Sequence, residues 1–388
     1  MLKKAMAGGA LAALLLLPVA APSADPPSRP AGETQLAAAG GGDSEAWRQL
    51  VEAARKEGKV ELILSGQVPA KLTKAMPEFE KKYGIKVNFQ SGGGSAHISR
   101  ILAERRLGRF TIDVWLGGAN GAIVSLLPNK AARPFAELLV DPEVVDPARW
   151  FGGKHHYTDP EGRYIFTWGA APSYNIAYNT KLVKPDEIKS YADLLDPKWR
   201  GKIVSWSPGQ GAGASVIPMY LNPKIGEEWF RRWANEMQVT IVTDARQGAE
   251  WVALGRFAIG MFGLNTQAET LKDQGFPIMD YLPHPMAEGE VLSASAANIM
   301  AMDRAPNPNA AKLFINWALG REAQSLFIKL AEKMDSLRTD VSNEVIPPQH
   351  RIDPKADYIV AWENPDYLTR QDEILAKLKA IMLEAGYR

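Results

Sequence analysis

The sequence of 388 residues contains no cysteine. It can therefore form no disulfide, offer no thiol nucleophile and build no thiolate metal site. Neither sign of charge dominates, because 45 lysine and arginine residues stand against 44 aspartate and glutamate residues. A chain this close to neutral has no electrostatic reason to bind nucleic acid, so we expect no nucleic-acid partner.

The chain also lacks an apolar run long enough to span a bilayer, which takes about 20 residues. The short apolar segment over residues 10–17 follows the basic Lys3 and Lys4 and precedes small residues. This pattern is typical of a cleavable export signal. We predict a signal peptide over residues 1–24 and a flexible leader, rich in Pro, Ala, Gly and Ser, over residues 25–42. The mature protein is then expected to be exported and soluble, and we expect a monomer.

Motifs of common enzyme classes are missing as well. The segment Gly93-Gly94-Ser95-Ala96 is followed by His97 instead of the glycine of a nucleophile elbow. The same turn lacks the third glycine of a dinucleotide site, and residues 207–215 lack the Gly-Lys-[Ser/Thr] of a nucleotide P-loop. We therefore expect no enzymatic activity and no cofactor, and a secreted α/β enzyme remains the rival class.

Alternating strand and helix patterns fill the first part of the mature chain. A helical run over residues 44–58 places Trp47, Leu50, Val51 and Ala54 on one face and stops at Gly58. Strands are predicted at 59–64, 85–89 and 114–116, and helices at 70–83 and 96–107. Such alternation at short spacing favours an α/β fold with a parallel sheet covered on both faces.

A second α/β series follows two β-runs at residues 164–168 and 174–178. Its predicted strands are 199–204, 239–242 and 258–262, its helices are 227–237 and 247–254, and residues 293–302 lead back toward the first series. We predict lobe 1 over residues 43–175, lobe 2 over 176–292, and a return to lobe 1, with the C-terminal helices, over 293–388.

Two turns rich in glycine and serine open helices in this pattern. Residues 91–95 precede the helix at 96–107, and residues 207–215 occupy the corresponding place in the second series. Free backbone N–H groups and the positive helix end make such a turn suitable for an anion. A tight connection or a surface loop that binds nothing is the alternative for each turn. One turn from each lobe can close on a single small ligand.

The chain resembles the periplasmic solute-binding proteins of bacterial ABC importers, in the branch that includes ferric-iron, thiamine and phosphonate binders. The segments that carry the resemblance are residues 54–60, 91–94, 102–106 with 113–114, 174–179, 193–202 and 338–341. Their order spans nearly all of residues 45–341. The resemblance implies a type II periplasmic binding protein fold, in which two Rossmann-like lobes are joined by crossover strands. It also implies a periplasmic location, a solute held in the cleft and an ABC permease in the inner membrane as partner.

One departure from that branch concerns metal binding. Its ferric binders use adjacent tyrosines of the second lobe, because phenolates are hard oxygen ligands for a hard cation. The corresponding segment here reads Gly260-Met-Phe-Gly-Leu-Asn265, and no Tyr-Tyr pair occurs anywhere in the sequence. We therefore predict no metal site and a small organic anion as solute, such as a carboxylate, a phosphonate or a phosphate ester. A ferric-ion binding protein remains the alternative.

Arg338 and the histidine pair each have a binding and a structural interpretation. Arg338 can hold an anion by two parallel hydrogen bonds, or it can be a surface residue that pairs with Asp335 or Asp340. His155 and His156 are interpreted as part of a solvated loop, because neighbouring residues of an extended segment point to opposite sides. The candidate ligand-binding residues are Ser65, Gly66, Ser91, Gly93, Gly94, Ser95, Gly118, Asn120, Tyr174, Asn175, Ser207, Gln210, Gly211, Ala212, Asp244, Asn265 and Arg338.

Overall fold

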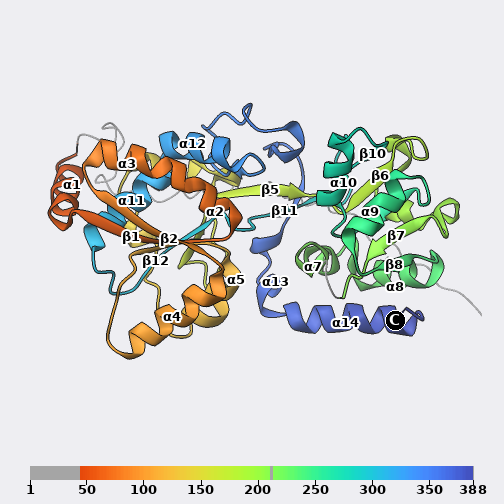
Figure 1. The fold of residues 1–388 in the computed structure, drawn as a ribbon, viewed down its shortest axis with the longest axis horizontal. Helices are drawn as coiled ribbons and strands as arrows, with labels where there is room; N and C mark the ends of the chain where they lie inside the picture. Colours follow the sequence, from red (N-terminus) through yellow and green to blue (C-terminus); the bar gives the residue numbers. More distant parts are fainter. Residues whose placement is uncertain (1–43, 210–212, 388) are drawn as a thin grey trace, which may run out of the picture. The chain divides into compact units, whose positions relative to one another are not determined.

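The structure, a computed structural model, describes residues 44–209 and 213–387. The predicted signal peptide and leader lie outside these residues. Among the helices of the described residues, none is both long and apolar enough to cross a membrane. The elements named below are labelled in Figure 1.

The first sheet has the strand order β2-β1-β3-β12-β4. Its strands are β1 (Lys59–Ser65), β2 (Lys86–Gly92), β3 (Val114–Gly117), β4 (Ile165–Thr167) and β12 (Asn298–Ala301). β1 pairs in parallel with both β2 and β3, whereas β12 is antiparallel to β3 and β4. The carboxyl ends of the three parallel strands therefore open onto the same edge of the sheet.

The second sheet has the strand order β10-β6-β9-β7-β8. Its strands are β6 (Ile176–Asn179), β7 (Ile203–Trp206), β8 (Thr240–Val242), β9 (Ile259–Met261) and β10 (Ile278–Met279). β7 is parallel to β8 and β9, and β6 is antiparallel to β9 and β10. This sheet repeats the mixed character of the first.

Two strands carry the chain between these sheets. β5 (Gly169–Ser173) follows β4 and precedes β6, and β11 (Glu290–Ser293) lies between β10 and β12 in the chain. They pair antiparallel to one another, flanked by β13 (Asp335–Ser336) and β14 (Tyr358–Val360). Figure 1 shows both strands running from one set of elements to the other. The predicted α/β fold, with two Rossmann-like lobes joined by crossover strands, is confirmed.

Helices cover both sheets. The α-helices are α1 (Glu45–Glu57), α2 (Gln67–Lys71), α3 (Met76–Tyr83), α4 (Gly94–Arg106), α5 (Ala119–Gly121), α6 (Pro142–Val145), α7 (Gly213–Leu221), α8 (Gly226–Glu236), α9 (Ala245–Ala253), α10 (Asn265–Asp273), α11 (Pro308–Leu319), α12 (Arg321–Ala331), α13 (Asp366–Thr369) and α14 (Gln371–Glu384). A π-helix spans Ala122–Leu126. The 3₁₀-helices are Leu72–Ala75, Ala136–Leu138, Pro147–Arg149, Phe151–Gly153, Pro185–Glu187, Tyr191–Leu195, Pro197–Trp199, Pro348–His350 and Ala361–Glu363.

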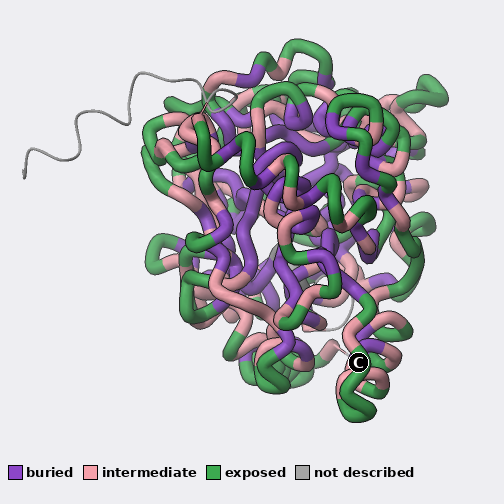
Figure 2. The backbone as a smooth tube through the Cα atoms, turned by 90° about the vertical axis from the view of Figure 1, so that its left-hand side faces the viewer, coloured by how far each residue is buried: buried purple, intermediate pink, exposed green. Residues whose placement is uncertain are grey.

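Each of the two five-stranded sheets is buried on both faces, as parallel sheets usually are. In β1, Leu62 and Leu64 belong to one apolar cluster, and Ile63 belongs to another on the opposite face. In β7, Ile203 and Val204 divide between two further clusters in the same way. Figure 2 shows the buried segments surrounded by exposed ones.

Capping chemistry explains why α1 forms where the sequence predicts a helix. The Ser44 hydroxyl accepts a hydrogen bond from the Trp47 backbone N–H at 3.2 Å, which satisfies one free donor of the first turn. Gly58 ends the helix in the left-handed conformation with φ of 74°. Leu50 and Ala54 are buried with Trp47, as the apolar pattern predicts.

Two predicted elements differ from those observed. The single helix expected over residues 70–83 is divided into α2, a 3₁₀ turn and α3. Pro77 stands in the first turn of α3, where its missing N–H costs nothing, whereas it would break a continuous helix. β5 was not predicted, because its sequence Gly-Ala-Ala-Pro-Ser has no β-branched residue.

The position of α14 corrects one further expectation. Residues 293–388 were assigned to a return to lobe 1, but α14 packs against α7 and α8. Its apolar face, with Ile374, Leu378 and Ile381, joins the same cluster as Ile203 of the second sheet. The apolar pattern of a helix shows that one face is buried but not which sheet buries it.

Candidate functional site

Three neighbouring parallel strands of the first sheet end in the same way. β1 ends at Ser65, which is in register with Gly92 of β2 and Gly117 of β3. A glycine follows each strand and opens a helix: Gly66 precedes α2, Gly93 precedes α4, and Gly118 precedes α5. Ligands of open α/β sheets bind at this edge, beyond the carboxyl ends of the strands.

None of these three glycines caps its helix with a side chain. The first N–H groups of a helix have no partner within the helix, and a serine or aspartate cap would occupy one of them. The 13-residue helix α4 is the longest of the three and carries the largest dipole. The edge therefore presents uncapped helix N-termini, which suit a negatively charged group.

Close packing around Ser65 requires glycine at two adjacent positions. A Cβ atom at Gly94 would lie 2.9 Å from the Ser65 Oγ, and one at Gly117 would lie 2.6 Å from the Ser65 Cβ. Gly66 has a φ of 101°, which other residues rarely adopt. These glycines bring the backbone of three strand ends together around the Ser65 side chain.

A cavity of about 490 Å³ opens at this edge, and we call it the glycine-loop cavity. The first lobe contributes Ser65, Gly66, Gly93, Gly94, Gly118, Ala119, Asn120 and Thr158. The remaining lining residues are Ile217 of α7, residues 293–296 and Asn298, and Ala361, Trp362, Tyr367, Leu368, Gln371 and Leu375 of the C-terminal segment. The cavity volume falls within the usual range for small-molecule sites.

Asn298 holds one wall of the glycine-loop cavity in place. Its Nδ2 donates to the carbonyl oxygens of Gly117 and Ser295, each at 3.2 Å. Its Oδ1 accepts from the hydroxyls of Thr158 and Thr167, each at 2.9 Å. Asn298 and Thr158 are not among the predicted ligand-binding residues. A polar residue at the start of an otherwise apolar strand is the signal that could have identified Asn298.

Six of the predicted ligand residues come together in this cavity. They are Ser65, Gly66, Gly93, Gly94, Gly118 and Asn120. Ser91 and Ser95 are exposed beside the same turn but do not line the cavity. Ser207 is half-buried after β7, and Asp244 caps α9 by accepting from the backbone N–H groups of residues 246 and 247. The predicted residues Gln210, Gly211 and Ala212 lie outside the described residues.

Three other predicted residues stabilise the structure near the second sheet. The Tyr174 hydroxyl donates to the Gln349 carbonyl at 2.8 Å, and burial raises the pKa of Tyr174. Asn175 is buried, and its Nδ2 donates to the Met219 Sδ at 3.1 Å. The Nδ2 of Asn265 donates to the Ile176 carbonyl at 2.9 Å, which ties α10 to β6. None of the three lines the glycine-loop cavity.

Arg338 is placed differently from the ligand-binding role predicted for it. Its side chain is fully buried, its Nη1 donates to the carbonyl oxygens of Glu143 and Leu319, and its guanidinium pairs with Asp340. It does not line the glycine-loop cavity. The pairing with Asp340 named in the alternative is present, but Arg338 is buried and not a surface residue as that alternative expected.

The histidine pair also departs from its interpretation as a solvated loop. His156 is buried, its Nε2 lies 2.8 Å from the Phe151 carbonyl, and its Nδ1 accepts from the Trp362 Nε1 at 3.3 Å. Burial lowers the pKa of both His155 and His156. His156 is therefore enclosed by Phe151, Trp362 and Glu363, whereas the preceding Lys154 remains exposed. Across the described residues, no group of three or more His, Asp or Glu side chains is placed to hold a metal ion.

Two α/β lobes, two crossover strands and a cavity at the strand ends define the class of two-lobed binding proteins. The family described as bacterial extracellular solute-binding protein matches residues 65–325, and the chain belongs to this family. Members of this family bind solutes and are not enzymes. The predicted recognition as a solute-binding protein is confirmed.

Individual relatives extend this comparison. The chain is 24% identical over 266 residues to the Iron uptake protein A1 of Synechocystis, covering 64% of this chain and 68% of that protein. The Trichodesmium protein IdiA (FutA), solved with iron and citrate, superposes with a TM-score of 0.61 at 20% identity, covering 85% of this chain and all of that one. AfuA of Actinobacillus pleuropneumoniae, solved with fructose-6-phosphate, gives a TM-score of 0.50 at 19% identity, covering 83% and 99% of the two chains.

Proposed function

We propose that this protein is the periplasmic substrate-binding subunit of an ABC importer and that it captures a small organic anion in the glycine-loop cavity. One observation carries the choice of an anion: three uncapped helix N-termini, at Gly66, Gly93 and Gly118, surround a single cavity. Their free N–H groups can donate to a carboxylate or phosphate without any cationic side chain. The export pattern of Lys3 and Lys4 supports the periplasmic location.

Side chains at the cavity can complete such a site. The Ser65 hydroxyl has no hydrogen-bond partner within the described part of the chain, and Asn120 is exposed at the start of α5. Each can donate one further hydrogen bond to a bound oxygen. The relatives support this chemistry, because citrate and fructose-6-phosphate, which are anions, occupy two structural neighbours.

Lobe closure is the mechanism that we propose for delivery. Lobe 1 (residues 43–175) and lobe 2 (residues 176–292) would move about β5 and β11, while the ligand stabilises the closed state through contacts that only this state makes. A permease of the inner membrane would then bind the closed form. Small-angle scattering tests this step, because the radius of gyration should fall when a validated ligand is added.

Ferric-ion binding is the second candidate, because the relatives include iron-binding proteins. The segment 260–265, which the resemblance places where ferric binders have their tyrosine pair, contains no tyrosine. Its Asn265 donates through Nδ2 to the carbonyls of Ile176 and Asp280. Tyr367 is the one tyrosine among the residues that line the described cavity. A ferric ion would therefore need oxygen ligands from a bound anion.

Thermal-shift screening tests the choice between these candidates, because a ligand stabilises the protein that binds it by mass action. The mature protein is screened with citrate, inorganic phosphate, fructose-6-phosphate, ferric chloride and ferric citrate, with glucose as the uncharged control. The proposal requires a clear shift with at least one metal-free anion. A shift with ferric salts alone would favour the second candidate, and steady chemical turnover of a ligand would favour the enzyme class.

Calorimetry with the best anion then tests the site. Ser65→Ala and Asn120→Ala should each weaken binding by about 1.5–3 kcal/mol, or roughly tenfold to a hundredfold, if each side chain donates to the charged group. Ser95→Ala is the matched control, because Ser95 is exposed on α4 and does not line the cavity. Equal affinities for all three variants would show that the anion does not bind in the glycine-loop cavity.

A further inference from the structure

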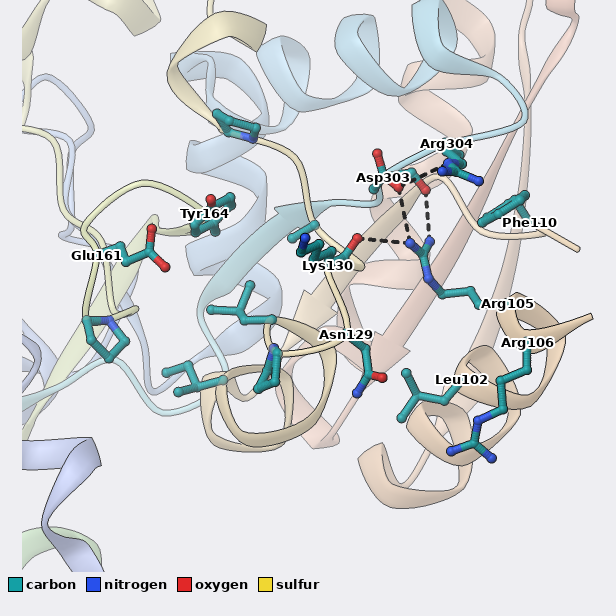
Figure 3. Close-up of a pocket in the computed structure, with 16 residues that line it drawn as sticks. Leu102, Arg105, Arg106, Phe110, Asn129, Lys130, Glu161, Tyr164, Asp303 and Arg304 are labelled. Atoms are coloured by element: carbon teal, nitrogen blue, oxygen red, sulfur yellow. Dashed lines mark hydrogen bonds and ion pairs between the residues drawn. The ribbon is translucent and has the colours of Figure 1, made fainter. Parts of the chain in front are cut away.

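A second hollow lies at the opposite end of α4 from the glycine-loop cavity. Its volume is about 960 Å³, and Leu102, Arg105 and Arg106 of the last turns of α4 line it. No residue lines both the hollow and the glycine-loop cavity. Figure 3 shows the hollow, which we call the Arg105 hollow. Its volume lies within the range of sites for small organic molecules.

Hydrogen bonds hold the Arg105 side chain in place at the wall of this hollow. Its Nη1 donates to the Asp303 carbonyl at 3.0 Å, and its Nη2 donates to the Lys130 carbonyl at 2.9 Å and to the Asp303 Oδ2 at 3.1 Å. These bonds, drawn in Figure 3, join the end of α4 to two other loops. Asp303 pairs with both Arg105 and Arg304, so its single negative charge offsets only one of these two cations.

Three further cationic side chains, those of Arg106, Lys130 and Arg304, line the hollow together with Arg105. The side chains of Arg106 and Lys130 have neither an ion pair nor a hydrogen bond among residues 44–209 and 213–387. The Arg304 guanidinium lies 3.6 Å from Asp303 and is 70% exposed. Glu161 is the opposing carboxylate on the lining besides Asp303. The hollow therefore carries an excess of positive charge although the whole chain is nearly neutral.

Apolar side chains line the space between these cations. Leu102, Ile123 and Leu127 are partly buried against the apolar cluster on this face of the first sheet. The ring of Phe110 lies 5.0 Å from the Arg105 guanidinium and 5.2 Å from that of Arg304. A ligand that fits this lining needs an apolar body next to a negatively charged group.

Unusual backbone conformations occur around the same hollow. Ile123 belongs to the π-helix Ala122–Leu126, and such helices are rare and often found at functional sites. Lys130 and Arg304 have φ angles of 50° and 55°, in a left-handed region that residues other than glycine, asparagine, aspartate and histidine adopt infrequently. Strain of this kind gathers at sites that bind ligands.

We propose that the Arg105 hollow is a second binding site, separate from the glycine-loop cavity, and that it takes a small amphipathic anion. The apolar body would lie against Leu102, Ile123 and Leu127, and a carboxylate or sulfonate would face Arg106, Lys130 and Arg304. Arginine suits this role because its planar fork binds two oxygens of an anion at once.

The probe for this site is 8-anilinonaphthalene-1-sulfonate, a fluorescent aromatic sulfonate, titrated into the mature protein. Binding at one site per chain is expected. The double variant Arg106→Glu with Arg304→Glu should lower the affinity for the probe roughly tenfold or more, because both charges are reversed. The control is Arg246→Glu. Arg246 lies on α9 and its side chain is 77% exposed, close to the 70% of Arg304. This change should alter the affinity for the probe less than about twofold. Circular dichroism checks that each variant is folded. If the charge-reversed double variant does not fold, the double variant Arg106→Gln with Arg304→Gln replaces it.

Competition with unlabelled amphiphiles tests the chemistry of the ligand. Decanoate should displace the probe, whereas decyltrimethylammonium, which has the opposite charge, and decanol, which has none, should not. Equal displacement by all three, or unchanged affinity in the charge-reversed variant, would overturn the proposal. Displacement of the probe by the anion that binds the glycine-loop cavity would also overturn it, because the two sites would then be one.

Discussion

Arg338 and Asp340 form a two-pronged ion pair within the first lobe, with Nε–Oδ1 and Nη2–Oδ2 distances of 2.8 and 2.7 Å. The guanidinium also lies 5.6 Å from the centre of the Trp150 ring. Together with its bonds to the carbonyls of Glu143 and Leu319, the pair joins segments that are far apart in the sequence.

Removing Arg338 should therefore reduce stability and leave ligand binding unchanged. Arg338→Ala leaves Asp340 with Arg149 as its remaining partner. It also removes the donor to the carbonyls of Glu143 and Leu319, and an acceptor left unsatisfied in this way costs roughly 1–3 kcal/mol. Urea unfolding followed by circular dichroism measures this loss. The control Arg246→Ala breaks an exposed pair with Glu250, which should have little effect. A stable Arg338→Ala variant with reduced anion affinity would restore the ligand-binding role predicted from the sequence.

The glycines below the cavity should differ sharply in their tolerance of alanine. A Cβ at Gly117 would lie 2.6 Å from the Ser65 Cβ and 2.8 Å from the Ser65 carbonyl oxygen. Gly117→Ala should therefore lower the unfolding free energy by about 1–3 kcal/mol, as overpacking usually does. Gly93 has no atom within 4 Å of a built Cβ, so Gly93→Ala should leave stability nearly unchanged. Equal melting temperatures for the two variants would contradict the packing argument.

A buried carboxyl at the start of β11 should make stability depend on pH. Burial raises the pKa of Glu290 from an ordinary 4.5 to about 7, and its Oε1 accepts from the Met286 N–H at 3.2 Å. The folded protein then holds a proton that the unfolded chain has released, so stability falls as the pH rises from about 4.5 through 7. The loss is roughly 3 kcal/mol at most.

Glu290→Gln tests this dependence, because glutamine keeps an acceptor for Met286 and carries no charge. The variant should match the wild type near pH 4.5 and exceed its melting temperature at pH 8. Glu250→Gln, on the exposed face of α9, serves as the control for a surface carboxyl. A wild-type melting temperature that rises between pH 5 and pH 8 in step with the variant would refute the buried-carboxylate argument.

Much of the fold could be predicted because it depends on local patterns. Residues such as Trp47, Leu50 and Ala54 recur at the helical period, and a glycine such as Gly58 ends the helix, so α1 could be located closely. β5 has neither apolar alternation nor β-branched residues. Its partner strands, and not its own sequence, hold it in the sheet. Its position follows from pairing with β11, which no local pattern reveals.

The candidate site was predictable to a lesser degree. Gly66, Gly93 and Gly118 share one signal, a glycine between a strand and a helix, and the parallel sheet brings such positions together. Arg338 and Asn265 carry polar side chains with equally strong binding chemistry, yet both are used within the structure. Whether a polar side chain faces a cavity or a carbonyl group depends on distant contacts, which the sequence does not display.

The C-terminal helix should control access to the glycine-loop cavity. Leu375 of α14 lines the cavity, whereas Leu383 of the same helix is 55% exposed. Leu375→Trp places a larger side chain in a cavity of about 490 Å³. It should therefore lower the affinity for the anion at least roughly tenfold through steric exclusion. Leu383→Trp places the same side chain in solvent and should leave the affinity unchanged. Calorimetry with matched melting temperatures measures both variants. Equal affinities for the two would show that the ligand binds away from α14, and the C-terminal segment would then have only its packing role against α7 and α8.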